Sequence, residues 1–167
     1  MRRWNAVEGR TGDSVKTLTY LLLAVTFIAA ASSPLRAAIA DDILGTWLNE
    51  EKDAQIEIFK CREKYCGKIV WLKEPNYPDG SKDGTPGTPK TDHHNPDPAL
   101  RNIPIIGLEI VHDFIYAGDD LWKEGRVYDP KSGRIYKGKM TLVSPQQLNL
   151  RGFIGISLIG RTATWTR

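Results

Sequence analysis

Two histidines and two aspartates gather in the stretch KTDHHNPDPALRNIPIIG, between Lys90 and Gly107. Imidazole and carboxylate groups can bind zinc or act as general acids and bases. Adjacent residues of an extended chain point in opposite directions, however, so His93 and His94 are poorly placed to bind one ion, and the only other histidine is distant. The stretch is therefore interpreted as a solvated loop at the rim of the fold, where the candidate residues are Asp92, Asn95, Asp97 and Arg101.

Other patterns that could support catalysis are incomplete. The segment GISLIG around Ser157 resembles the G-x-S-x-G nucleophile elbow, but its fifth position is Ile159 and no strand-to-helix pattern surrounds it. Paired aspartates occur at 41–42 and 119–120, where solvated loop charge is the simpler explanation. The chain has no phosphate-binding or dinucleotide-binding fingerprint. We predict no catalytic residue, no cofactor and no metal site.

The pattern of the first forty residues is typical of an export signal. A basic segment precedes an apolar run from Leu18 to Ala31, and Ala38-Ile39-Ala40 offers a small-residue cleavage site before Asp41. An uncleaved membrane anchor is the alternative, but fourteen apolar residues fall short of the roughly twenty that span a bilayer. We predict a signal peptide over 1–40, cleaved after Ala40, and a periplasmic or secreted domain over 41–167 with no transmembrane span.

Charge argues against a polyanion partner. The leader holds five of the 23 basic and two of the 20 acidic residues, so 18 of each sign remain in 41–167. A neutral domain is not typical of nucleic-acid binding proteins, and we predict no nucleic-acid partner. The remaining length suits one domain with one core.

The two cysteines, Cys61 and Cys66, lie in this exported part, where an oxidising compartment favours a disulfide. They flank a predicted hairpin in which residues 62–65 form the turn. That register places Ile58 opposite Ile69 and Ile56 opposite Trp71, so that these four apolar side chains share one face.

Alternating short runs predict an all-β domain. They lie near 44–49, 54–60, 66–73, 105–116, 121–128, 134–143, 147–154 and 158–166. About eight strands suit a small closed antiparallel barrel, with a two-sheet sandwich as the alternative. One long loop, from Glu74 to about Pro104, interrupts the strands, and within it Asp97 is placed to cap a helical turn that starts at Pro98.

Tryptophans in the predicted strands indicate either a packed barrel or one with a cavity for a small ligand. The inner-face candidates for ligand binding are Trp47, Ile56, Ile58, Ile69 and Trp71.

Several stretches together resemble the exported bacterial family called domain of unknown function 2147. They are Gly45-Thr46-Trp47, CREKYCGKIVWLKEP, NPDPALR, Tyr128-Asp129-Pro130 with Gly133, and the closing GRTATWTR. The resemblance implies a lipocalin-like barrel in which a tryptophan of the first strand packs against an arginine of the last. Trp47 fits the first role. Arg161 and Arg167 both fit the second, because alternation puts them on one face.

Three functions remain open at this stage. The first is binding of a small hydrophobic or amphipathic molecule in the cell envelope, with loop 74–104 near the barrel mouth. The second is a packed barrel that serves as an envelope interaction module through Asn95–Arg101. The third is an envelope enzyme that uses Asp92, His94 and Asp97. The sequence specifies neither the ligand nor the oligomeric state.

Overall fold

The computed structural model describes residues 39–155 and 158–167, which belong to one compact all-β unit. Residues 1–38 of the predicted leader lie outside this described part, as does Ser157 of the GISLIG segment. Among the described residues, no helix is long and apolar enough to cross a bilayer.

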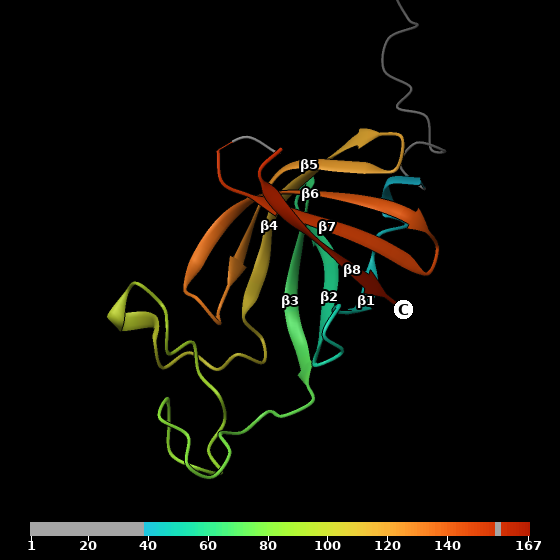
Figure 1. Cartoon of the computed structure of the whole chain (residues 1–167). Helices are drawn as coiled ribbons and strands as arrows, with labels where there is room; N and C mark the ends of the chain where they lie inside the picture. Colours follow the sequence, from blue (N-terminus) through green and yellow to red (C-terminus); the bar gives the residue numbers. More distant parts are fainter. Residues whose placement is uncertain (1–38, 156–157) are drawn as a thin grey trace, which may run out of the picture. The chain divides into compact units, whose positions relative to one another are not determined.

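Eight antiparallel strands close into a barrel in sequence order, which confirms the predicted fold class (Figure 1). Each strand pairs with the next in the chain, and the Leu48–Thr166 pair joins the last strand to the first. Closure joins the two end strands of the sheet, β1 and β8, through this single residue pair, whereas a two-sheet sandwich would leave its edge strands unjoined. The strands are β1 (Gly45–Leu48), β2 (Ala54–Cys61), β3 (Lys64–Leu72), β4 (Glu109–Gly118), β5 (Leu121–Asp129), β6 (Arg134–Ser144), β7 (Gln147–Phe153) and β8 (Gly160–Thr166).

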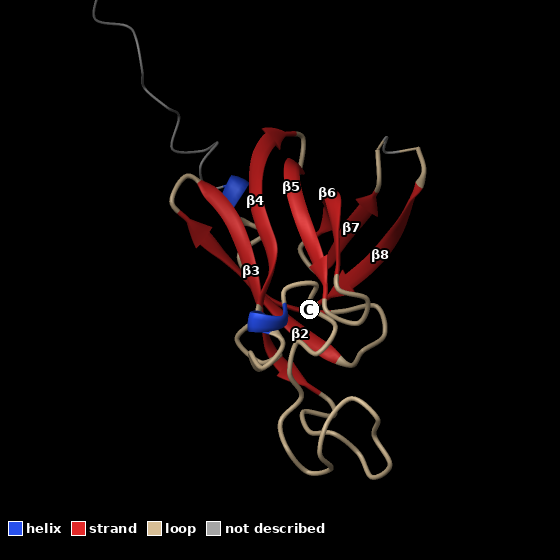
Figure 2. Cartoon of the chain, turned by 90° about the vertical axis from the view of Figure 1, so that its left-hand side faces the viewer, coloured by secondary structure: helices blue, strands red, loops and turns tan. Residues whose placement is uncertain are grey.

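The long loop connects β3 to β4 and carries one short 3₁₀ helix, η1 (Pro98–Leu100). Figure 2 shows it as the largest segment without strands. Asp97 accepts a hydrogen bond from the backbone N–H of Ala99, and Pro98 opens the helix. The predicted cap and helical turn are therefore present.

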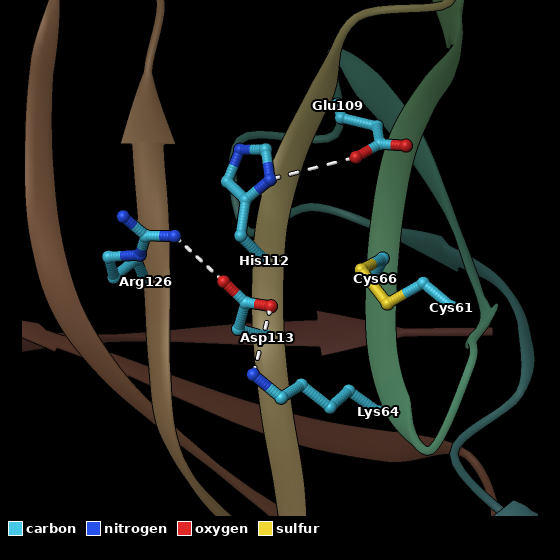
Figure 3. The surroundings of a disulfide bond; sticks show 7 residues. All are labelled: Cys61, Lys64, Cys66, Glu109, His112, Asp113 and Arg126. Carbon is cyan, nitrogen blue, oxygen red and sulfur yellow. Dashed lines mark hydrogen bonds and ion pairs between the residues drawn. A yellow bond between two sulfur atoms is a disulfide. The ribbon is translucent and has the colours of Figure 1, made fainter.

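The β2–β3 hairpin contains the predicted disulfide between Cys61 and Cys66 (Figure 3). The predicted pairing was wrong, because Cys61 pairs with Lys64 and the turn has only two residues. Ile56 consequently faces Ile69, and Ile58 faces Gly67.

Trp71 does not face the interior, contrary to the prediction. The register shifts between Gln55 and Ile56, so that Val70 is an extra residue in β3 and Trp71 pairs with Gln55. An extra residue reverses the faces of the residues beyond it. The Trp71 side chain is 41% exposed as a result.

Large side chains fill one half of the barrel. Phe114 packs against Gly125 and Gly138, where an added Cβ would overlap the phenyl ring. Both glycines are thus required by the close approach of an aromatic ring across the sheet. The fully buried residues of this packed half include Trp47, Val111, Phe114, Trp122, Met140 and Leu148.

An arginine covers the packed end of the barrel. The guanidinium of Arg167 lies 4.2 Å from the centre of the Trp47 ring and donates to the carbonyl oxygens of Asp42, Leu44 and Pro145. The Trp47 indole in turn donates to the carbonyl of Ile43. The structure therefore places Arg167, and not Arg161, against the tryptophan.

Candidate functional site: an open apolar cavity

The other half of the barrel is hollow. A cavity of ≈1340 Å³ extends from the barrel interior through its open mouth to the long loop, which lines its outer part with residues such as Tyr77, Pro78 and Thr91. Such a volume is large for a site that holds one small molecule, since typical ligand pockets measure about 300–1,000 Å³. Its apolar wall includes Ala54, Ile56, Ile69, Leu72, Val127, Leu150, Ala163 and Trp165.

Two small residues on neighbouring strands contribute to the open space at this end of the barrel. Leu148, Leu150 and Gly152 alternate along β7 and pair with Trp165, Ala163 and Arg161 of β8. The Leu148–Trp165 pair is buried, whereas nearer the mouth each pair has one small member, Ala163 or Gly152, and the Arg161 side chain is exposed and paired with Glu50. An eight-stranded barrel has room for one ligand where its inward residues are small.

Charged residues surround the mouth. Arg161 is paired with Glu50 at 2.7 Å, and Lys131 is paired with Asp53 at 3.0 Å. Burial raises the pKa of Asp53, but hydrogen bonds from Asn49 and Lys131 outweigh it and hold that pKa below its usual value. The entrance is thus polar, whereas the wall below it is apolar.

A buried carboxylate fastens the long loop to the barrel. Asp92 is fully buried, and it accepts hydrogen bonds of 2.6 Å from the Tyr128 hydroxyl and from the Asn95 amide. Burial, followed by the hydrogen bond to Asp92, raises the pKa of Tyr128, so its hydroxyl remains protonated and keeps donating. A buried charge is tolerated where such donors satisfy it.

The NPDPALR segment folds as a local unit next to this carboxylate. The Asn95 side chain accepts from the Asp97 backbone N–H, and the Arg101 guanidinium donates to the Asn95 carbonyl. Asn95 therefore joins the buried Asp92 to the exposed helical turn. Hydrogen bonds thus connect the four predicted rim residues and stabilise the conformation of the loop. These residues are Asp92, Asn95, Asp97 and Arg101.

The β5–β6 turn touches the same loop. Gly133 has φ +68°, and an added Cβ would overlap the carbonyl oxygen of His94. Only glycine fits both the conformation and the contact. Asp92 and Gly133 therefore hold the loop against β5 and the following turn.

The histidines lie at the mouth without a metal-like arrangement. His93 and His94 rings meet edge to face at 5.2 Å, and His93 lies 3.9 Å from Asp83. No group of three or more His, Cys, Asp or Glu within the described residues could hold a metal ion.

The two aspartate pairs, 41–42 and 119–120, lie where they support the fold. Asp119 and Asp120 both have positive φ in the tight β4–β5 turn. Asp41 accepts from the Tyr65 hydroxyl and pairs with Lys60.

The inner-face predictions separate into three groups, of which the first is Trp71 alone, exposed on the outer face. Ile56 and Ile69 line the cavity. Trp47 and Ile58 are buried but do not line it, because they belong to the packed half. Sequence reasoning missed most of the wall, although the alternation of QLNLRGF and RTATWTR could have indicated Leu150, Ala163 and Trp165.

Comparisons with known proteins agree with this geometry. The family model described as "Uncharacterized protein conserved in bacteria (DUF2147)" matches residues 45–167. A solved structure, protein HP1028 from the human pathogen Helicobacter pylori, described as belonging to the lipocalin family, is similar at 25% identity with a TM-score of 0.62. The match covers 75% of this chain and 82% of that one. No curated protein sequence matches the chain.

Proposed function

The chain belongs to the bacterial family DUF2147 and has a lipocalin-like barrel, and from this premise we propose that it binds a small amphipathic molecule in the cell envelope. The observation that carries the proposal is the open cavity of ≈1340 Å³ with its apolar wall. A barrel that served only as a packed interaction module would need no such space.

The wall and the rim together favour an amphipathic ligand. Apolar atoms of the ligand gain about 0.8 kcal/mol for each methylene that leaves water for the wall. A polar end would remain near Arg161, Lys131 and Asp53, which already face solvent at the mouth. Ile56, Ile69 and Leu150 are the proposed contacts of the apolar part.

An envelope location is part of the same proposal. The Cys61–Cys66 disulfide is typical of oxidising compartments, and the leader pattern over 1–40 supports export. Cleavage after Ala40 would keep Asp41, with its bonds to Tyr65 and Lys60, and every strand of the barrel.

A chain-length series tests the ligand class. Purified protein is titrated with a fluorescent fatty acid, which is then displaced by saturated fatty acids of increasing length. We expect affinity to rise roughly tenfold for every two added methylenes until the cavity is full. An affinity independent of chain length, or no binding by folded protein, would overturn the proposal.

A cavity-filling variant supplies the matched control. Ala163→Phe places a ring inside the wall and should weaken the longest ligands by about tenfold or more. Val143→Phe changes an exposed residue of β6 that does not line the cavity, and it should leave binding unchanged. Equal affinities of the two variants would locate binding elsewhere.

A further inference from the structure

Large apolar side chains are exposed on both sides of the connection between β7 and β8, at residues 154 and 158–159. Leu158 is 84% exposed, Ile159 72% and Ile154 67%, the three highest values among large apolar side chains of the described residues. We call these three residues the β7–β8 tip. Exposed isoleucines and leucines are ordinary when scattered, but three of them at the ends of one connection are typical of a contact surface.

The tip continues into the cavity. Ile154 and Ile159 are highly exposed, yet both also line the mouth together with Phe153. Ile135, 60% exposed, is the second residue of β6 and lies two residues before Lys137, which pairs with Phe153 at the end of β7. An apolar surface therefore runs from the outside of the tip into the barrel.

Positive charge accompanies the tip. Seven basic residues and no acidic one follow Pro130 in the chain, but Arg167 covers the packed end, and Arg161 and Lys131 are paired with Glu50 and Asp53 at the mouth. The cations beside the tip are those of β6 and β7. Lys137 and Lys139 project from β6, and Lys139 pairs across the sheet with Arg151 of β7. Arg151 also donates to the carbonyl of Leu158, which ties the cation to the tip.

We propose that the β7–β8 tip docks reversibly on an anionic lipid surface, with Leu158, Ile159 and Ile154 in the interfacial layer and the β6–β7 cations above the headgroups. Apolar side chains backed by Lys and Arg are the combination that holds proteins at such surfaces. A second copy is a poorer occupant, since a symmetric dimer through the tip would bring these cations together.

The docking surface is independent of whether the cavity holds a ligand. It would place the mouth beside the lipid and give an apolar molecule a path between membrane and barrel. The two proposals can therefore fail separately.

Co-sedimentation with vesicles tests the docking. The full chain is mixed with vesicles of phosphatidylglycerol and phosphatidylethanolamine, or of phosphatidylcholine alone, at low and high salt. We expect binding to the anionic vesicles, and a weakening of several-fold when salt screens the cations.

Two variants separate the contributions. Leu158→Ser with Ile159→Ser should lower the partition coefficient about tenfold or more. Lys137→Glu with Lys139→Glu should lower binding to anionic vesicles and reduce its salt dependence, because Arg151 remains. The matched control, Ile115→Ser with Val143→Ser, removes two exposed apolar side chains away from the tip and should bind like the wild type.

Each outcome has a defined meaning. Thermal unfolding of every variant shows that it is folded, and fatty-acid displacement reports on the cavity separately. The proposal is overturned if the wild-type protein does not bind anionic vesicles. It is also overturned if the tip variant binds them as well as the control variant does. A dimer in light scattering that the tip substitutions dissociate overturns it as well, because that result would assign the tip to a second copy.

Discussion

At the scale of single residues, Arg161 of β8 and Arg167, which directly follows β8, have different surroundings. Arg161 and Arg167 are six residues apart, which separates them by about 20 Å along an extended strand. Arg161 therefore lies at the open mouth, paired with Glu50, whereas Arg167 lies over Trp47 at the packed end. Alternation alone could not distinguish them.

Arg167→Ala should lower the free energy of unfolding by about 2 kcal/mol. The variant loses the cation–π contact with Trp47 and leaves three carbonyl acceptors without their donor. Arg161→Ala, which removes only an exposed ion pair, should cost less than about 1 kcal/mol. Denaturant unfolding of both variants measures the difference, and equal losses would contradict the assigned role.

Asp92→Ala should destabilise the protein by about 1–3 kcal/mol and loosen the long loop. The substitution leaves the Tyr128 hydroxyl without its acceptor and frees Asn95 from the barrel. Limited proteolysis should cut within 74–104 faster than in the wild type. Asp97→Ala, which removes only an exposed cap, serves as the control and should leave the loop attached. Unchanged cleavage in Asp92→Ala would show that other contacts hold the loop.

At the scale of elements, the β2–β3 hairpin shows how backbone detail decides which side chains face inward. Arg62 has φ +62° and allows a two-residue turn without glycine. Further along β3, Val70 forms a bulge, so that Ile69 faces the interior and Trp71 faces outward. The disulfide was predictable from compartment and spacing, but the register was not.

Removing the disulfide should cost about 2 kcal/mol, because it closes a loop of only six residues. The measurement is denaturant unfolding of the wild type with and without a reducing agent. Cys61→Ser with Cys66→Ser should match the reduced wild type and should not respond to reductant. A response in that double variant would assign the effect to something other than the disulfide.

Gly133→Ala should destabilise the protein more than Gly80→Ala. Both glycines have a positive φ near +70°, so both variants incur the backbone strain. Only at Gly133 would the new methyl group overlap the His94 carbonyl, whereas Gly80 has open space around it. Thermal unfolding of the two variants isolates the cost of that contact, and matching losses would mean that the loop moves aside freely.

At the scale of the whole molecule, carboxylates with lowered pKa join separate elements. Burial raises the pKa of Asp41, but hydrogen bonds from Lys60 and Tyr65 outweigh it. Hydrogen bonds from Arg126 and then Lys64 lower the pKa of Asp113, which lies between them in Figure 3. The pKa of Asp53, at the mouth of the barrel, is also lowered.

Stability should therefore fall in acid. A carboxyl group with a folded pKa below its unfolded value, about 3.9 for Asp, contributes stability above that value and loses it as the pH falls through the folded pKa. We expect a steady melting temperature between about pH 5 and 8 and a decline below about pH 4. In Asp53→Asn the melting temperature should fall less steeply below about pH 4 than in the wild type. An unchanged decline would argue against a contribution from the ion pair between Asp53 and Lys131.

Stability should also fall at strongly alkaline pH. Tyr65 and Tyr128 both have a raised pKa, chiefly through burial and then through a hydrogen bond to an aspartate. Their contribution is complete below the pKa of an unfolded tyrosine, about 10, and is lost as the pH rises through the higher folded values. Tyr128→Phe should reduce the alkaline loss seen in a melting series.

By itself, the sequence determined the all-β class, the number of strands, the disulfide and the capped turn in the long loop. Each of these depends on residues close together in the chain: alternation, neighbouring cysteines, or Asp97 before Pro98. Only the tertiary structure decided that Arg167 covers Trp47, that Asp92 is buried against Tyr128, and that Trp71 faces outward. Those outcomes depend on contacts between distant strands and on a single bulge, and the cavity likewise is formed by residues of several strands and of the long loop that meet at one end of the barrel.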